Sequence, residues 1–335
     1  MLSDRTDIRL ALPSKGQLAA ATLDFLTAAG LQVYKPNPRQ FEATIPALPG
    51  LKVLFQRAAD IPLSVRDGSV DFGVTGWDVT AERVDGNNGL LPLLPALGYG
   101  HCSLHVIVPE AWKDVRIMAD LAELQANQLN PLRVATKFPR LAGKHLSEHG
   151  LKHFRLIHAD GTLEAAPAIG YADVIVDLVS SGTTLRDNRL RALEDGTLLT
   201  SQACLIANRE ALRARSPVLE MARQILDILV AHLRAVENVA IFANMRGESP
   251  AAIARLIFEK PVIAGLQGPT ISPVFTPQGE HWHAVNIVVK KTDLPQAIAE
   301  LRSIGGSGVI VTPITYIFEE EPEATRAMLA ALESD

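Results

Sequence analysis

The stretch EAAPAIGYADVIVDLVSSGTTL, residues Glu164–Leu185, contains the clearest strand in the chain. Its centre, Val174–Val179, is a run of β-branched residues and leucine that is broken only by Asp177, which predicts a short strand buried on both faces. A short helix and a turn at Gly170 are expected before this strand, and Leu185 is expected to begin a helix after it. Such strands alternate with helices in α/β folds, which bind ligands beyond the carboxyl ends of their strands.

The five residues that follow this strand are suited to holding a phosphate group. They combine one glycine with hydroxyl side chains: Ser180, Ser181, Gly182, Thr183 and Thr184. Backbone amides in such a loop can form a concave anion site, and the start of the next helix adds positive charge there. Asp177 lies beside the loop, and one carboxylate can accept hydrogen bonds from two adjacent sugar hydroxyls. The pattern favours a sugar phosphate, although a plain strand with a Ser/Thr-rich helix cap contains the same residue types.

The composition is that of an ordinary globular protein of more than one domain. A chain of 335 residues with 47% hydrophobic and 21% charged residues can bury two or three cores. Its net charge of −5 argues against a general nucleic-acid binder. We find no secretion signal and no apolar run of about 18 residues, so no membrane span is expected. Cys102 and Cys204 are far apart and are expected to be reduced thiols of a cytoplasmic protein.

The same stretch resembles the signature of the ATP phosphoribosyltransferases, which catalyse the first step of histidine biosynthesis. The matching residues are Glu164, Gly170, Ala172, Asp173, Ile175, Asp177, Leu178, Ser181, Gly182, Thr184 and Leu185. The resemblance implies that Asp177 and the loop after it hold the ribose and the 5′-phosphate of 5-phosphoribosyl 1-diphosphate. Glu164 would then contact the ribose or cap its own helix.

Other candidate ligands for phosphates follow predicted strands, at the sheet edge where α/β proteins bind ligands. They are Lys15 and Gly16 after Ile8–Leu12, Arg57 after Leu51–Gln56, Thr75 and Gly76 at the end of Val70–Thr75, and Lys137 after Leu132–Ala135. The segments FQRAADIPLSVRDGSVDFGVTGWD and RVATKFPRLA resemble the same family, which implies contacts with ATP and diphosphate. On residue types alone, Lys15 is equally well explained as a solvated charge behind an N-cap at Ser14.

The resemblance implies an α/β catalytic region of two lobes, of the periplasmic-binding-protein type. Lobe I is expected over residues 1–103 and 188–222, and lobe II over residues 104–187, which carry the phosphate loop. A helix is expected after Asn188, and the strand Ala203–Ala207 would then return the chain to lobe I. A helix over about Pro217–Val236, with one apolar face, is expected to connect the lobes to the rest of the chain.

The remaining strands and helices predict a ferredoxin-like domain over residues 236–320. Its βαββαβ order comprises strands at Val239–Asn244, Thr270–Phe275, Trp282–Val289 and Val309–Phe318, and helices at Pro250–Phe258 and Leu294–Ile304. The pieces GPTISPV and GVIVTPI resemble the regulatory domain of the long-form enzymes, in which free histidine binds between subunits and inhibits. The resemblance implies histidine contacts at Thr270 and Ser272 and a homo-hexamer. The acidic tail over residues 321–335 has no assigned role.

The implied reaction joins N1 of the adenine of ATP to the anomeric carbon of 5-phosphoribosyl 1-diphosphate and releases diphosphate. The expected catalytic residues are Asp177, Arg57, Lys15 and Glu164, which orient two charged substrates and stabilise the leaving group. Mg²⁺ is expected on the phosphate oxygens, without assigned protein ligands. Two other functions fit the residues: a two-lobed small-molecule binding protein without catalysis, and a salvage phosphoribosyltransferase, although the paired acids before Thr-Gly-Gly-Thr of the latter are absent.

Overall fold

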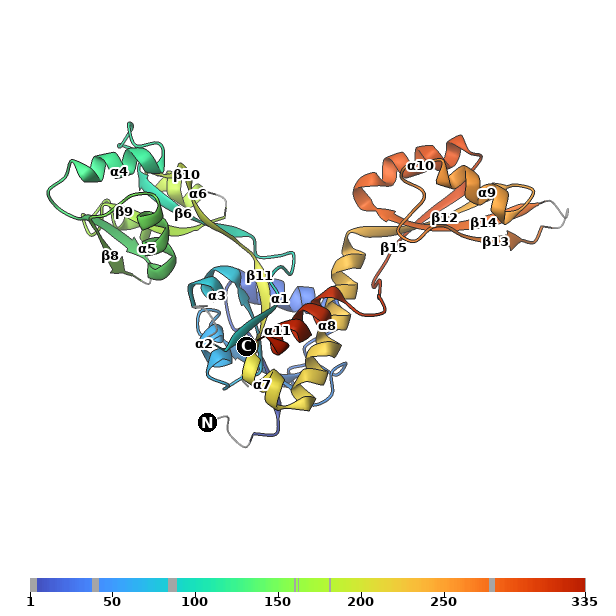
Figure 1. The fold of residues 1–335 in the computed structure, drawn as a ribbon, viewed down its shortest axis with the longest axis horizontal. Coiled ribbons are helices and arrows are strands. Elements are labelled where there is room, and N and C mark those ends of the chain that lie inside the picture. Colours follow the sequence, from blue (N-terminus) through green and yellow to red (C-terminus); the bar gives the residue numbers. More distant parts are fainter. Residues whose placement is uncertain are drawn as a thin grey trace. The chain divides into compact units, whose positions relative to one another are not determined.

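The chain forms two structural units, and the first of them contains two β-sheets (Figure 1). The computed structural model describes residues 5–37, 42–83, 89–159, 161, 163–180, 182–276 and 281–334. Among these, unit 1 comprises the residues up to Arg223 and those from Ala327, and unit 2 comprises Gln224–Arg326. We call the two sheets of unit 1, with their helices, lobe I and lobe II.

Lobe I is built on a six-stranded sheet in the order β2-β3-β1-β4-β11-β5. Its strands are β1 (Ile8–Pro13), β2 (Glu42–Thr44), β3 (Leu51–Gln56), β4 (Phe72–Gly76), β5 (Leu90–Leu94) and β11 (Ala203–Asn208), and its helices are α1 (Gln17–Ala28), α2 (Ile61–Arg66), α3 (Trp77–Arg83) and α7 (Arg209–Ala214). Strand β1 is parallel to β3 and β4, whereas β11 is antiparallel to both of its neighbours. The carboxyl ends of β1, β3 and β4 therefore lie along one edge of the sheet.

Lobe II is built on a five-stranded sheet in the order β10-β6-β9-β7-β8. Its strands are β6 (Cys102–Pro109), β7 (Leu132–Thr136), β8 (Phe154–His158), β9 (Val174–Val179) and β10 (Leu190–Ser201), and its helices are α4 (Met118–Ala126), α5 (Pro139–Glu148), the 3-10 turn η1 (Leu163–Ala165) and α6 (Thr183–Asp187). Strand β7 is parallel to both β8 and β9, so their carboxyl ends also share an edge.

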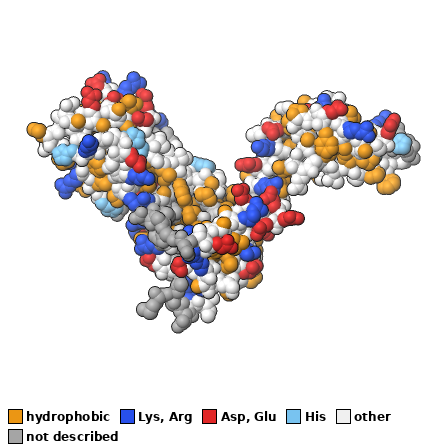
Figure 2. Space-filling view, viewed as in Figure 1, with side chains coloured by type: hydrophobic (Ala, Val, Ile, Leu, Met, Phe, Trp, Pro, Cys, Tyr) orange, Lys and Arg blue, Asp and Glu red, His pale blue; other side chains and the backbone are white. Residues whose placement is uncertain are grey.

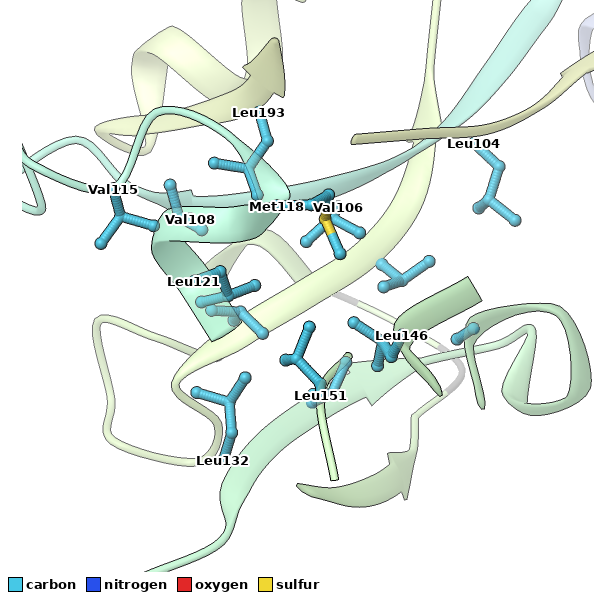
Figure 3. Close-up of a cluster of buried hydrophobic side chains, with 14 of the residues drawn as sticks. Leu104, Val106, Val108, Val115, Met118, Leu121, Leu132, Leu146, Leu151 and Leu193 are labelled. Atoms are coloured by element: carbon cyan, nitrogen blue, oxygen red, sulfur yellow. The ribbon is translucent and has the colours of Figure 1, made fainter. Parts of the chain in front are cut away.

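The central strand β9 is buried on both faces, as its sequence predicts. Val174 and Val176 belong to a hydrophobic cluster that also contains Leu104, Val106, Met118 and Leu146 (Figure 3). Ile175, which points to the opposite face, belongs to a second cluster with Ile107 and Leu185. Apolar burial on both sides leaves only the carboxyl end of this strand for polar side chains.

The helix expected after Asn188 is wrong, because the chain there forms the twelve-residue strand β10. Leu190 and Leu193 are buried at a spacing that imitates a helix, but a register shift between Ala192 and Thr197 lets the strand pair with β6 around a bulge. The chain consequently stays in lobe II until Ser201 and enters lobe I only with β11. Two smaller differences are that α6 begins at Thr183 instead of Leu185, and that the helix before Gly170 is the single 3-10 turn η1.

Unit 2 has the predicted ferredoxin-like order. It consists of β12 (Asn238–Arg246), α9 (Pro250–Phe258), β13 (Thr270–Val274), β14 (Trp282–Lys290), the short η2 (Lys291–Asp293), α10 (Leu294–Ser303) and β15 (Ser307–Pro313). The strands pair antiparallel in the order β13-β14-β12-β15, and one face of the sheet packs with α9 and α10 through residues such as Ile241, Ile257 and Leu301. The last strand ends at Pro313, five residues earlier than expected. The fold class predicted from the sequence is therefore confirmed.

The predicted connecting helix is α8 (Ser216–Val236), and the acidic tail contains a further helix, α11 (Glu323–Glu333). Within unit 1, Arg209 Nη1 donates to Ala331 O at 2.9 Å, and Arg213 Nε donates to Leu332 O at 2.9 Å. These arginines cap the end of α11, where backbone carbonyls lack helical partners. None of the helices in the described residues is both long and apolar enough to span a membrane.

Asp71, just before β4, holds together three distant parts of unit 1. Its carboxylate is fully buried and accepts hydrogen bonds from Arg5 Nη2 at 2.8 Å, from Arg215 Nη1 at 2.7 Å and from the Arg9 amide at 2.8 Å. A buried carboxylate is tolerated only when it is paired in this way. The two arginines are themselves mostly buried, so they depend on Asp71 in turn.

We expect Asp71→Ala to lower the free energy of unfolding of unit 1 by about 3–5 kcal/mol, because it leaves two buried guanidinium groups without their carboxylate. Asp67→Ala is the matched control, since Asp67 pairs with Arg66 at the surface and should contribute less than about 1 kcal/mol. Urea unfolding followed by circular dichroism measures both. Equal effects of the two substitutions would contradict the assigned role of Asp71.

Candidate active site

The loop after β9 surrounds a small hollow in lobe II. This loop hollow, of about 50 Å³, is lined by Glu164, Asp177, Leu178, Val179, Ser180, Gly182, Thr184 and Leu185. Gly182 adopts a left-handed conformation (φ 69°) immediately before α6, which an L side chain rarely adopts. Ser181 lies outside the described residues, and Thr183 is exposed next to the hollow. The structure thus brings together Glu164, Asp177 and most of the predicted loop.

The positive charge beside this loop comes mainly from an arginine side chain and not, as expected, from the start of the helix. Helix α6 has only five residues, so the partial charge at its start is small. Arg186, on the same helix, donates from Nη2 to the Thr183 hydroxyl at 3.2 Å and places a full charge next to the loop. Arg186 was not among the predicted site residues, although it is the second residue of the expected helix.

Asp177 is half-buried at the carboxyl end of β9, and one of its carboxylate oxygens accepts the Leu178 amide at 2.8 Å. Burial raises the pKa of Asp177 above its ordinary value of 3.8, and the nearby Glu164 carboxylate raises this pKa further. The Leu178 amide and the Lys137 ammonium group act in the opposite direction without cancelling the effect of burial. Three residues predicted from separate segments therefore interact electrostatically at one place.

A larger, cationic cleft lies where the carboxyl ends of strands from lobe I and lobe II face one another. It has a volume of about 510 Å³ and is lined by Lys15, Arg57, Ala59, Asp60, Val79, Glu82, Arg83, Lys137, Phe138 and His158. Lys15 follows β1, Arg57 follows β3 and Lys137 follows β7. Four lysine and arginine side chains and two carboxylates make this a site for a polyanion such as a polyphosphate.

Three of the residues predicted to bind ATP, namely Gly16, Thr75 and Gly76, are not among the lining residues of the cleft. Thr75 is fully buried, and its hydroxyl donates to Ala58 O at 2.7 Å. A Cβ at Gly76 would collide with the carboxylate of Asp78, which is buried and accepts the Ser201 hydroxyl at 2.7 Å. Gly16 precedes α1 with φ 82°. Thr75 and Gly76 therefore have packing roles in the structure, and the positive φ of Gly16 favours glycine there.

Several lining residues were missed from the sequence. Asp60, Glu82 and Arg83 lie on or next to α2 and α3, while Phe138 and His158 lie at or just after the carboxyl ends of β7 and β8. His158 is the last residue of β8, where the rule that ligands bind at carboxyl ends of strands could have selected it. Glu82 and Arg83 end a helix, and no local pattern marks a helix end as part of a cleft.

Comparisons with known proteins identify relatives over nearly the whole chain. The sequence profile of HisG, ATP phosphoribosyltransferase, matches residues 57–232, and that of the HisG C-terminal domain matches residues 235–316. ATP phosphoribosyltransferase 2, chloroplastic, from Arabidopsis thaliana is 43% identical over 98% of this chain and 81% of its own length. ATP phosphoribosyltransferase from Rhodopseudomonas palustris (strain HaA2) is 33% identical over 93% of this chain and 94% of its own.

One solved structure also has a similar fold. The ATP phosphoribosyl transferase (HisG:HisZ) complex from Thermotoga maritima contains a chain that aligns with a TM-score of 0.51 and 22% identity. The alignment covers 67% of this chain and 98% of that chain.

The raised pKa of Asp177 predicts an unusual stability effect. Because the ionised carboxylate is disfavoured in the folded state, the wild-type protein loses stability as the pH rises from 3.8 through the raised pKa. We therefore expect Asp177→Asn to be at least as stable as the wild type at pH 8, with a difference that shrinks toward pH 4. Thermal melting at several pH values measures this.

Asp173, four residues before Asp177, is the control, because its pKa is shifted in the opposite direction. Burial acts to raise the pKa of Asp173, but hydrogen bonds and the charge of Arg133 outweigh burial and hold this pKa below 3.8. The stability from this pair is present above pH 3.8 and is lost as the pH falls through the lowered pKa. Asp173→Asn should therefore destabilise the protein at pH 8. A destabilising Asp177→Asn of similar size would overturn the assignment.

Proposed function

Because this chain belongs to the ATP phosphoribosyltransferase family, we propose that its loop hollow binds ribose 5-phosphate and its cationic cleft binds ATP. The chain catalyses the first step of histidine biosynthesis, which joins N1 of the adenine of ATP to the anomeric carbon of 5-phosphoribosyl 1-diphosphate and releases diphosphate. The two other functions that fit the sequence, a binding protein without catalysis and a salvage phosphoribosyltransferase, are set aside by this family membership.

The observation that carries the proposal is that Asp177, Glu164 and the loop after β9 line one hollow. A carboxylate offers about four acceptor positions. The Leu178 amide uses one of them, which leaves acceptors for two adjacent ribose hydroxyls. The influence of Glu164 on the pKa of Asp177 puts the two acids close together and supports a ribose contact for Glu164 as well.

We assign the 5′-phosphate to the part of the hollow that the loop forms. Ser180, Gly182 and Thr184 line it, and we include the neighbouring Ser181 and Thr183 in the phosphate site. Amides of a loop with a left-handed glycine can converge on a phosphate, and the hydroxyls donate further hydrogen bonds. The guanidinium of Arg186 supplies charge beside them.

The reaction requires orientation of the two substrates and stabilisation of the developing charges more than it requires a nucleophilic side chain. As the bond from the anomeric carbon to diphosphate breaks, negative charge grows on the diphosphate and positive charge grows on the ribose. Lys15, Arg57 and Lys137 would stabilise the diphosphate and the ATP phosphates, while Asp177 and Glu164 hold the ribose in place. Fixing both substrates in the cleft contributes a large part of the rate enhancement because the encounter becomes effectively intramolecular.

A divalent metal accompanies this reaction in the family, and we propose Mg²⁺ carried by the substrate phosphates. Within the described residues no three His, Cys, Asp or Glu side chains gather into a metal site. Among the described residues that line the cleft, the carboxylates are Asp60 and Glu82, and they lie beside several cations. Such a donor set fits a hydrated Mg²⁺ that enters on diphosphate oxygens, where the ion would neutralise charge on the leaving group.

Unit 2 contains a second hollow, of about 290 Å³, that we propose as the histidine site. Its lining includes Arg234, Gly268, Thr270 and Asn286. Thr270 pairs with Asn286 across the strands β13 and β14, so both side chains lie on one face of the sheet. The Asn286 Oδ1 atom is buried and has no hydrogen-bond partner among the residues that the structure describes, which suits a donor such as the ammonium group of an amino acid. Arg234, which also pairs with Glu319, would bind the carboxylate of the amino acid.

Ser272, the other residue expected to contact histidine, lies two positions along the same face of β13 and outside the lining of this hollow. We propose that it contributes where a second copy of the chain meets this face. Exposed apolar side chains of unit 2, among them Phe242 and Ile310, support contact between copies and hence the homo-hexamer (Figure 2). We also propose a cytoplasmic location, which is consistent with two free cysteines.

We expect Asp177→Asn to reduce kcat/KM for 5-phosphoribosyl 1-diphosphate at least 100-fold, because the amide accepts fewer hydrogen bonds and bears no charge. Release of diphosphate in the presence of ATP measures turnover. Asp173→Asn, assayed well below its melting temperature, should stay within about threefold of the wild type. Near-normal activity of Asp177→Asn would remove the ribose assignment.

For regulation, we expect Thr270→Val to raise the histidine concentration for half-inhibition about tenfold, which corresponds to the loss of one hydrogen bond. Activity without histidine should not change, because Thr270 lies in unit 2. The surface substitution Thr292→Val, outside the hollow, is the control. Unchanged inhibition in both variants would mean that histidine binds elsewhere.

A further inference from the structure

A pair of helix ends, one from each lobe of unit 1, is joined at the rim of the cationic cleft. Glu82 lies near the end of α3 in lobe I, and its two carboxylate oxygens accept the backbone amides of Arg140 at 2.8 Å and Leu141 at 3.0 Å. These amides belong to the first turn of α5 in lobe II. In return, the Arg140 guanidinium donates to the carbonyls of Glu82, at 2.9 Å, and Ala81.

Each helix end is therefore capped by a side chain from the other lobe. The first amides of a helix and its last carbonyls have no partners inside the helix. Helix α5 begins with Pro139, and Phe138, the residue before it, offers no side-chain cap. A carboxylate at a helix start and a guanidinium at a helix end are also the favourable charges for the helix dipole. Glu82 thus supplies a cap that the sequence of α5 lacks.

The location of this contact links it to the substrates. Glu82 lines the cleft itself, and the start of α5 follows Lys137 and Phe138 directly. Holding that start against α3 fixes Lys137 relative to Lys15 and Arg57 on the opposite lobe. The cations of the two lobes repel each other when no anion lies between them. The capped helix ends oppose this repulsion.

We infer that Glu82 is a positioning residue of the reaction, which keeps the two cationic walls of the cleft at the separation that the phosphates of ATP span. This inference rests on the proposed function. It assigns Glu82 to the phosphates that lie in the cleft, whereas binding of the ribose 5-phosphate part is independent of Glu82, because the loop hollow lies within lobe II. Glu82 acts through the helix amides and not by contact with the reacting atoms.

The kinetic test uses Glu82→Gln, which keeps the shape but replaces one acceptor oxygen with a donor that faces an amide. We expect kcat/KM for ATP to fall about tenfold. The Kd for ribose 5-phosphate, which has no diphosphate to enter the cleft, should stay within twofold when it is measured without ATP. Arg140→Ala, which removes the reciprocal cap, should shift the ATP parameters in the same direction. Glu123→Gln, at an exposed position on α4, is the control and should change nothing.

A purely structural role predicts a different result, namely a lower melting temperature and equal losses for ATP and for ribose 5-phosphate. Either that result, or ATP kinetics within twofold of the wild type in both variants, would overturn the inference.

Hydrogen exchange provides a readout that does not depend on turnover. The amides of Arg140 and Leu141 should exchange at least tenfold faster in Glu82→Gln than in the wild type. Unchanged exchange would refute the cap itself. If the wild type released no diphosphate with ATP, the proposed function would fail, while the exchange experiment would still test the contact between the lobes.

Discussion

The constraint on which the site depends is the burial of β9 on both faces. Apolar clusters cover the strand on each side, so an ionisable side chain can exist only where the strand leaves the sheet. Asp177 occupies that point, and burial still raises its pKa. Ionisable groups with shifted pKa values are common at functional sites, which agrees with the proposed ribose contact. The turn at Gly182 then brings the loop back toward the carboxylate.

The second element of the design is the meeting of two sheets. In each lobe, parallel strands end at one edge, and residues that follow these ends line the cationic cleft. The chain passes from lobe I to lobe II between β5 and β6, and returns between β10 and β11. Cations from both lobes therefore gather around a single volume, and substrates with several phosphates are the ligands that relieve their mutual repulsion. The caps that Glu82 and Arg140 form between the lobes oppose the same repulsion.

The sequence predicted those features that depend on neighbouring residues. The run Val174–Val179, the loop after it and the position of Lys15, Arg57 and Lys137 after strands all follow from local patterns, and the structure contains them. Strand β10 was missed because Leu190 and Leu193 imitate helical spacing, whereas its pairing with β6 depends on residues 81 to 99 positions earlier in the chain. The contact of Glu82 with α5 was equally invisible, since nothing near residue 82 reveals which helix start lies opposite it. Thr75 shows that a local pattern can also select a residue with another role. Its type and position suited a ligand contact, but its hydroxyl donates a hydrogen bond to Ala58 O.

The close approach of Gly76 and Asp78 has a consequence for how this sequence can evolve. Any side chain at position 76 would displace the buried carboxylate that accepts the Ser201 hydroxyl, so the three positions are expected to change together or not at all. Position 201 is the last residue of β10, directly before the return to lobe I. A substitution at position 76 would thus also affect the crossing between the lobes. We expect these three positions to covary in related sequences.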